Sequence, residues 1–447
     1  SGNITLREDS ASGTVVENFG IGSSVTITNN SLSITPTSDL SENKIYHLSY
    51  PSGVITNMAG ESYVGTAYTF KSKAIPRQIW MMGQNAYGGV GQNNRTQYSS
   101  PVQVPGTSWK RIVTGDRGTV IATKTDGTLW SWGYGYLGNL GHNEGGEKSY
   151  SSPVQVGTDT TWDTITEGYY HTLATKTDGT LWVWGYDSWG ISAEHSDTLK
   201  SSPCQIGSDT TWSKALGGYY SAGAIKTDGT LWLWGRNHVG QLAQNNVTSP
   251  SNHGISSPVQ VPGTWSHWGG AHGNSLGVKT DGTLWAWGAN EFGELGQNVG
   301  MFNPSNSYYS SPVQIPGSTW SLSSKAYRSS AAIKTDGTLW TWGHNGSGQL
   351  GQNEQGSTNT SRSSPVQVPG TTWSYIAHGH NSWYATKTDG TMWVWGSNSY
   401  GQLGKNNTTE YSSPVQIPGT EWITQSGYWG NVRTGGQRTA GLMKETS

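Results

Sequence analysis

One phrase recurs along most of this sequence and limits the folds that the chain can adopt. Lys-Thr-Asp-Gly-Thr, an apolar residue and Trp-x-Trp-Gly return at intervals of roughly 50 residues, which is typical of solenoids and propellers. The aspartates of its six copies are Asp126, Asp178, Asp228, Asp281, Asp336 and Asp389. A second phrase, Ser-Ser-Pro-x-Gln, has seven copies, each followed by a single Trp. Such a chain folds as an array of similar units that bury their apolar faces against their neighbours.

Each repeat predicts four short strands. Asp-Gly favours positive φ at both centres of a two-residue hairpin turn, so His171–Lys176 and Leu181–Gly185 are expected to pair. A third strand contains Pro153–Val156, where proline suits a strand start or an edge, and a fourth begins at Trp162. No segment shows helical periodicity. Four short strands in each repeat indicate an all-β propeller blade.

The two ends of the repeat region complement each other. Residues 79–83 match the second strand of the Asp-Gly hairpin, and residues 441–444 match its first strand. Strands from both ends are therefore expected to complete one blade and remove the open edges of the ring. This predicts a seven-bladed propeller over residues 77–447.

The loop after the hairpin resembles a known family. Gly-x-Asn-x-x-Gly-Gln-Leu-Gly, found at residues 343–351 and 396–404, is similar to the repeat of the regulator of chromosome condensation. The resemblance implies a β-propeller used as a binding platform, in families that include exchange factors, a light sensor, an enzyme inhibitor and viral structural proteins. The third copy departs from this pattern at residues 189–193.

Residues 1–72 have a different character, with no Trp and with many Ser and Thr. The alternating segment 24–28, together with 32–36, 45–48 and 53–60, resembles an S-layer-type immunoglobulin-like domain. This resemblance implies a small β-sandwich spacer, joined by a linker at residues 73–76 to the propeller. The expected fold class is thus all-β in both domains.

Most tryptophans belong to the repeat. Twelve lie in the Trp-x-Trp pairs, seven follow the proline phrase and Trp80 occupies a repeat position in the closing blade. Packing between blades accounts for these side chains. The other four of the 24, Trp189, Trp268, Trp383 and Trp429, have no repeat equivalent, so both local packing and ligand contact remain open for them.

Hairpin topology predicts where the varied residues lie. The Asp-Gly turns form one uniform face, while the turns before the hairpin and the loops after Trp-Gly meet at the opposite end. Aromatic, His and Arg residues there suit partner recognition. The candidate binding residues are Tyr169, Tyr170, Tyr219, Tyr220, Trp189, His272, Tyr327, Arg328, His380, Trp383, Tyr428 and Trp429. Loops add Tyr134, Tyr136, Tyr186, His238 and Phe292.

Charge and motifs narrow the classes of function. A net charge of -2, with 12% charged residues, leaves no basic footprint for nucleic acid, and no apolar run suggests a membrane span. Motifs for metalloproteases, serine hydrolases and nucleotide-binding loops are absent from the sequence. His378 and His380 are the one candidate metal pair, against a plain structural role. No cofactor is expected, and the single Cys204 excludes an intrachain disulfide.

The sequence therefore predicts a non-enzymatic binding or structural protein at a virion or an extracellular surface. A bacteriophage fibre, tail or capsid-decorating protein fits the spacer and the near-neutral composition. Its expected partner is a protein or a cell-surface glycan, or another virion protein. The alternatives are a bacterial surface adhesin or inhibitor and, more remotely, a propeller enzyme.

Overall fold

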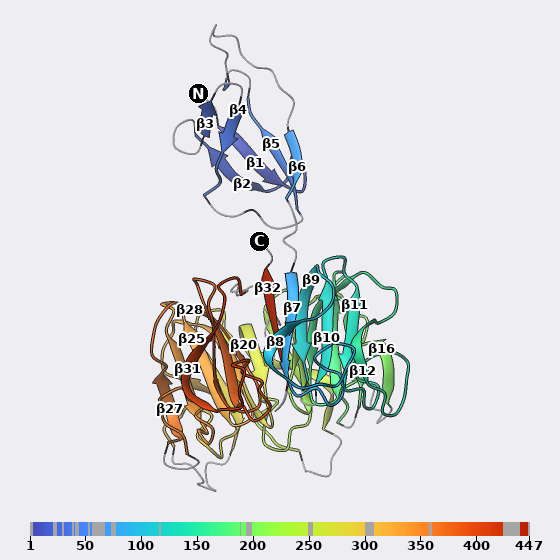
Figure 1. The fold of residues 1–447 in the computed structure, drawn as a ribbon, viewed down its shortest axis with the longest axis vertical. Helices are drawn as coiled ribbons and strands as arrows, with labels where there is room; N and C mark the ends of the chain where they lie inside the picture. Colours follow the sequence, from blue (N-terminus) through green and yellow to red (C-terminus); the bar gives the residue numbers. More distant parts are fainter. Residues whose placement is uncertain are drawn as a thin grey trace. The chain divides into compact units, whose positions relative to one another are not determined.

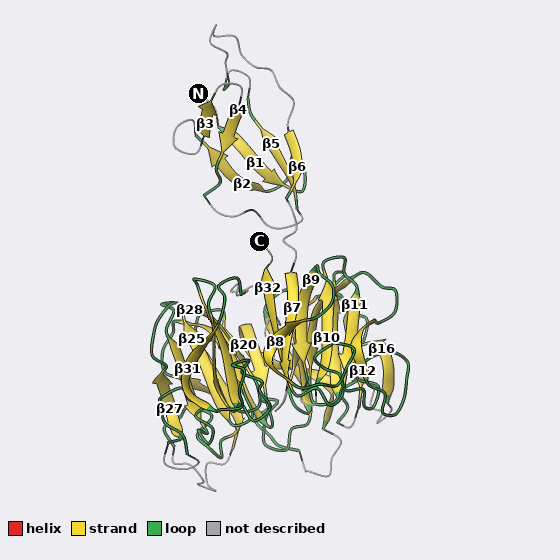
Figure 2. Ribbon diagram, in the orientation of Figure 1, coloured by secondary structure: helices red, strands yellow, loops and turns green. Residues whose placement is uncertain are grey.

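The chain divides into two compact units, Ser1–Pro76 and Arg77–Thr446 (Figure 1). The computed structural model describes residues 3–20, 25–28, 31–37, 40, 44–51, 54–55, 68–72, 77–115, 118–187, 189–193, 199–248, 254–299, 308–356, 360–422 and 439–445. The expected linker at residues 73–76 and parts of the expected spacer lie outside these ranges. Figure 2 shows strands joined by loops, and no helix occurs among the residues described. The same residues accordingly offer no helix that could cross a membrane.

The described residues of the first unit form two sheets. The larger has the order β2-β1-β5-β6, and β3 pairs with β4 in the smaller. The bounds are β1 Ile4–Glu8, β2 Val15–Phe19, β3 Val25–Thr28, β4 Ser31–Ile34, β5 Ile45–Ser49 and β6 Tyr68–Lys71. Ile4, Leu6, Phe19 and Tyr46 are buried together, so this unit has an apolar core of its own.

The second unit consists of small antiparallel sheets built on the repeat. Four sheets have four strands each: β9 to β12, β13 to β16, β24 to β27 and β28 to β31. Their bounds are β9 Trp109–Thr114, β10 Thr119–Lys124, β11 Leu129–Gly133, β12 Tyr150–Gln155, β13 Trp162–Glu167, β14 His171–Lys176, β15 Leu181–Gly185, β16 Lys200–Gln205, β24 Trp320–Lys325, β25 Ser329–Lys334, β26 Leu339–Gly343, β27 Arg362–Gln367, β28 Trp373–His378, β29 Ser382–Lys387, β30 Met392–Gly396 and β31 Tyr411–Ile417. The all-β propeller expected from the repeat is therefore the observed fold.

A seven-stranded sheet joins two further repeats, because one strand serves both. Its order is β17 to β23, with bounds β17 Trp212–Gly217, β18 Ser221–Lys226, β19 Thr230–Gly235, β20 Ile255–Gly270, β21 Asn274–Lys279, β22 Leu284–Ala289 and β23 Tyr308–Ile315. The first part of β20 pairs with β19 and its second part pairs with β21. The connection Val261–Trp265 is one residue shorter than Val104–Trp109 in the sister repeat, which leaves no room for a separate loop.

The ends of the second unit pair with each other. β32 (Thr439–Glu445) lies antiparallel to β7 (Arg77–Gly83), which in turn pairs with β8 (Tyr98–Gln103). Figure 1 shows β32 and β7 side by side although they come from opposite ends of the colour scale. Trp422 bridges to Lys444 on the other side of β32. This pairing is the one expected from residues 79–83 and 441–444.

The Asp-Gly turn shows why its residues recur together. In one copy, Asp178 Oδ1 accepts hydrogen bonds from the backbone N–H and the hydroxyl of Thr180 at 3.0 and 2.7 Å. The indole of Trp182 then donates to the same hydroxyl at 2.8 Å. Trp184, the second of the pair, is fully buried and donates to the carbonyl of Asn139 in the preceding blade at 2.9 Å. One phrase thus encodes the turn and the contact between blades.

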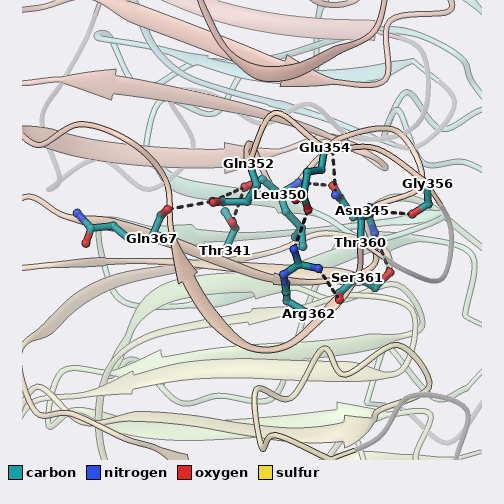
Figure 3. Close-up of polar contacts among 10 residues, drawn as sticks. All are labelled: Thr341, Asn345, Leu350, Gln352, Glu354, Gly356, Thr360, Ser361, Arg362 and Gln367. Carbon is teal, nitrogen blue, oxygen red and sulfur yellow. Dashed lines mark hydrogen bonds and ion pairs between the residues drawn. The ribbon is translucent and has the colours of Figure 1, made fainter.

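The glycine-rich loop is organised by its asparagine (Figure 3). Asn345 Oδ1 accepts from the N–H of Leu350 at 2.9 Å, and its Nδ2 donates to the carbonyl of Glu354 at 3.0 Å. Gly348 has φ of +73°, and a Cβ there would lie 2.6 Å from the Cα of Ser412 in the next blade. Glycine is therefore required both by the backbone conformation and by the close approach of the blades.

Candidate functional site

Five rings form a continuous arc at one end of the propeller. We call Tyr169, Tyr219, His272, Tyr327 and His380 the central aromatic arc. The ring centroids of Tyr169 and Tyr219 are 4.1 Å apart, and those of Tyr219 and His272 are 4.6 Å apart. His272 and Tyr327 follow at 4.8 Å, and Tyr327 stacks on His380 at 4.2 Å. Neighbouring repeats thus place their rings in contact.

The repeat itself positions this arc. Each of its residues lies in the short turn that precedes the first strand of an Asp-Gly hairpin, such as the turn between β13 and β14. The loop that follows the hairpin meets this turn, because the N–H of Tyr186 donates to the carbonyl of Tyr170 at 2.8 Å. Equivalent turns of neighbouring blades therefore bring equivalent residues together, as hairpin topology predicts.

A cavity of about 100 Å³ lies within the arc. Its wall consists of Tyr169, Tyr219, His272, Tyr327 and His380, with backbone at the intervening Gly and Ala positions and with Thr114, Glu167 and His378 at the ends of first strands. Small residues lie between the rings, so the side chains that reach this cavity are mainly those of the tyrosines and histidines. The site is thus concave with aromatic side chains in its wall, which is usual for a recognition surface.

The series of ring contacts continues outward through Tyr170 and includes Tyr134, which is buried. Its ring centroid lies 4.0 Å from that of Tyr169 and 5.3 Å from that of Tyr136. Tyr136 stacks on Tyr134 at 5.8 Å, and Tyr134 contacts Tyr87 at 4.4 Å. Sequence reasoning named these tyrosines except Tyr87, which lies in the copy of the glycine-rich loop at residues 83–91, where Met82-Gly83 replaces Trp-Gly.

Two arginines stand over aromatic rings at the rim. The guanidinium carbon of Arg236 lies 4.7 Å from the Trp189 ring centroid and 5.4 Å from that of Tyr220. Arg328 lies 4.3 Å from the centroid of Phe292. Such cation–π pairs stabilise a rim in a fixed geometry. Arg236 was missed from the sequence, although its place directly after Trp-x-Trp-Gly is where the varied loop residues begin.

Burial lowers the pKa values of three histidines of this face, which favours their neutral form. Burial, followed by the nearby His272 and Arg328, lowers the pKa of His380 to about 4. Desolvation, with Arg236 and Arg328, also lowers the pKa of His272. Burial lowers the pKa of His238 to about 4. Neutral imidazoles donate and accept hydrogen bonds, so the arc offers polar ring edges without added charge.

A buried lysine lies at the end of β24, next to the turn that holds Tyr327. Lys325, directly before Ala326 and Tyr327, is fully buried and its Nζ donates to Ser330 Oγ at 2.6 Å. Burial lowers the pKa of Lys325 and raises that of the nearby Glu294 carboxyl. Both groups are engaged inside the protein, so they belong to the scaffold of the arc.

The prediction that Trp383 lies on the binding face is wrong. Its side chain is 0% exposed, within β29, in the same core cluster as Tyr384 and Trp395. Trp268, which also lacks a repeat equivalent, is 0% exposed too. Both extra indoles fill the interior, where apolar burial stabilises the fold. The other two candidates of this kind behave differently, since Trp189 is half-buried at the rim and Trp429 lies outside the described residues.

The remaining candidates divide in the same way. Tyr169, Tyr170, Tyr219, Tyr220, Tyr327, Arg328 and His380 are half-buried, and His272 is exposed. Tyr428 lies outside the described residues, as does Trp429. No group of three or more metal-ligating side chains occurs in the described part of the chain, and His378 instead bonds to Ser324 Oγ at 3.0 Å.

Sequence comparison identifies the repeat. The model of the regulator of chromosome condensation (RCC1) repeat matches residues 126–175, 281–323, 336–385 and 389–427. The ultraviolet-B receptor UVR8 of Arabidopsis thaliana is 25% identical over 307 residues, which cover 65% of this chain and 66% of the receptor. The mitochondrial RCC1 domain-containing protein RUG3 of the same plant is 28% identical, over 73% of this chain and 62% of its own length. The chain thus spans less than two thirds of these relatives.

Solved structures agree on the fold. Prp20p of Saccharomyces cerevisiae aligns with a TM-score of 0.72 at 15% identity, over 83% of this chain and 92% of Prp20p. Human WBSCR16 aligns with a TM-score of 0.69 at 16% identity, over 83% of this chain and 99% of its own. At these identities the likeness concerns the fold alone. The chain therefore carries RCC1 repeats, folded as an RCC1-like β-propeller.

Proposed function

We propose that this chain is a non-catalytic binding protein that holds a protein partner on the central aromatic arc. The observation that supports this is the continuous contact of five rings around a cavity. Aromatic residues and arginine are enriched at binding hot spots. One solved structure of Prp20p concerns its binding to Gsp1p and histones, and another holds it bound to Kap60. These partners of a similar propeller favour a protein over a glycan.

The test is a paired screen of a random peptide display library and a glycan array. Tyr169→Ala combined with Tyr219→Ala should weaken the selected binders by about 2 kcal/mol or more, roughly 30-fold, as expected for hot-spot residues. Asp228→Asn, in an exposed Asp-Gly turn, is the matched control and should leave affinity unchanged. Binders that depend on Asp228 and ignore both tyrosines would contradict the proposal. Selective glycan binding would favour the glycan instead.

The number of blades is part of this proposal. The separate sheets, the sharing of β20 by two repeats and the pairing of β32 with β7 support seven blades closed by both ends of the chain. A density map from electron microscopy, viewed along the ring axis, would count them directly.

We also propose that the protein resides on a virion or at an extracellular surface. Near-neutral composition and a separate N-terminal β-unit, which we propose to be an immunoglobulin-like spacer, support a virion or an extracellular surface. A phage particle component and a bacterial surface adhesin or inhibitor are the two forms of this proposal. Mass spectrometry of purified particles and of surface fractions would distinguish them.

A further inference from the structure

We call the contact between two neighbouring blades a seam. One seam lacks the indole side chain that fills the others. Trp132 shows the usual arrangement: it lies in one core cluster with Val104 and Trp109, and its ring centroid is 5.9 Å from that of Trp109. A Cβ on Gly91 would lie 3.0 Å from Trp132 Nε1. At the closing seam Met82 stands in this position, since Met82 pairs with Ala440 as Trp132 pairs with Val120.

A pocket of about 370 Å³ lies at this seam. Its lining is Trp80, Ser100, Pro101, Gly404, Lys405, Asn406, Ile417, Pro418, Trp422 and Lys444. Gly404, Ile417 and Trp422 occupy the same repeat positions as Gly91, Val104 and Trp109, which surround the indole of Trp132. We call this the seam pocket, and its wall includes the surface that receives an indole elsewhere in the ring.

At the closing seam, another side chain of the protein bonds to the backbone carbonyl that would accept from the missing indole. Trp395 Nε1 donates to the carbonyl of Gln349 at 3.0 Å, and the equivalent carbonyl at the closing seam is that of Gln402. Tyr384 Oη donates to this carbonyl at 2.8 Å. Tyr384 is fully buried, and neither it nor Gln402 lines the seam pocket. The hydrogen bond at the seam is therefore made without a ligand, and neither of its residues occupies the seam pocket.

The lining has two chemical parts. Trp80, Trp422, Pro101, Pro418 and Ile417 supply flat apolar walls, which suit an aromatic ring. The charged lining residues are both lysines, Lys405 and Lys444. Lys405 Nζ donates to the carbonyl of Gln416 at 2.6 Å, and it forms no ion pair with a carboxylate of the described residues. Lys444 Nζ pairs with Glu421 at 2.8 Å.

We propose that the seam pocket binds a planar aromatic carboxylate about the size of an indole acid. Its ring packs on the tryptophan and proline walls, and its carboxylate meets the ammonium group of Lys405. Lys405 stands where four of the other loops carry Gln92, Gln244, Gln297 and Gln352, and where the remaining two carry His142 and Glu194, so a lysine at this position occurs at this seam alone. Lys444 contributes less, because Glu421 already neutralises it.

Indole-3-acetate is the probe for the first experiment, with the full chain labelled at its methionine methyl groups. The chain has six methionines, and Met82→Leu assigns the signal of interest. The expected result is a saturable shift of the Met82 methyl signal, with a Kd on the order of 1 mM or tighter, as for a ligand of this size. The absence of a saturable Met82 shift would overturn the proposal.

Two variants test the two parts of the site. Lys405→Gln restores the residue of the sister loops and should weaken indole-3-acetate about fivefold while leaving uncharged indole unchanged. Lys148→Gln, on an exposed loop of another blade, is the control and should change neither. Equal binding of indole-3-acetate to Lys405→Gln and to the parent chain would refute the role of charge.

The second variant fills the seam. Met82→Trp combined with Tyr384→Leu copies the buried pair Leu173 and Trp234 of another seam, and should weaken both probes at least tenfold. Unchanged binding to a folded double variant would refute the placement of the site. If the double variant does not fold, the Met82 shift and Lys405→Gln still decide the question.

Discussion

Removal of β32 is the sharpest test of how the propeller is held together. Deletion of residues 439–447 takes away the strand that pairs with β7 over Arg77–Gly83. Leu442 and Met443 are each 0% exposed, and two fully buried side chains of this size contribute about 3–6 kcal/mol. At roughly 2–4 °C per kcal/mol for a large domain, the melting temperature should fall by about 6–24 °C. Two exposed sheet edges should also promote aggregation.

The matched control removes a longer segment from the other end. Deletion of residues 1–72 takes away only strands of the first unit, β1 to β6, and none of the propeller. Differential scanning calorimetry and light scattering of both truncated chains, beside the parent, measure the two effects. The propeller transition should stay in place after the long deletion and shift after the short one. An unshifted transition without residues 439–447 would refute closure by β32 as a source of stability.

Three further predictions concern single side chains. Trp383→Ala should lower the free energy of unfolding by about 3–5 kcal/mol in chemical denaturation, because it empties a buried site, whereas Tyr170→Ala should have little effect. An ion pair with Lys226 holds the pKa of Asp209 at about 2. The stability that this carboxylate contributes is therefore present above pH 4 and is lost as pH falls toward 2. In Asp209→Asn, the midpoint of chemical denaturation should depend less on pH over that range. Burial lowers the pKa of His380 to about 4, so as pH falls the unfolded chain binds a proton at a higher pH than the folded protein does. The free energy of unfolding should therefore fall between pH 6.5 and pH 4. This decrease should be smaller in His380→Gln.

Much of the propeller follows from local chemistry that a sequence displays. The Asp-Gly-Thr phrase fixes a hairpin through bonds within three residues, as Asp178 and Thr180 show. The Asp-Gly turn has six copies and the proline phrase has seven. The blade without the turn is therefore the one whose hairpin strands come from the two ends of the repeat region. Pairing of β32 with β7 is the non-local contact predicted in this way.

The residues of the candidate site were harder to predict from the sequence than the fold. Trp383 has no repeat equivalent, which leaves both local packing and ligand contact open on the sequence alone. In the register of β29 it pairs with Trp395, as Val120 pairs with Trp132, so it replaces a smaller residue in the interior. A non-repeated aromatic residue can thus fill a seam as well as face solvent. The stacking of Tyr169 on Tyr219 depends on the distance between blades, which no single repeat encodes.

The long strand β20 has a consequence for how the molecule opens. Wherever a flexible connection joins two blades, each blade can open locally while its neighbour stays folded. β20 passes from one sheet to the next without a loop, so its amides belong to both. The two blades that share Ile255–Gly270 should exchange their amide hydrogens as one cooperative unit, slower than the blades joined by loops. An inserted peptide between Val261 and Trp265 should be tolerated less well than one in the longer connection between Val156 and Trp162.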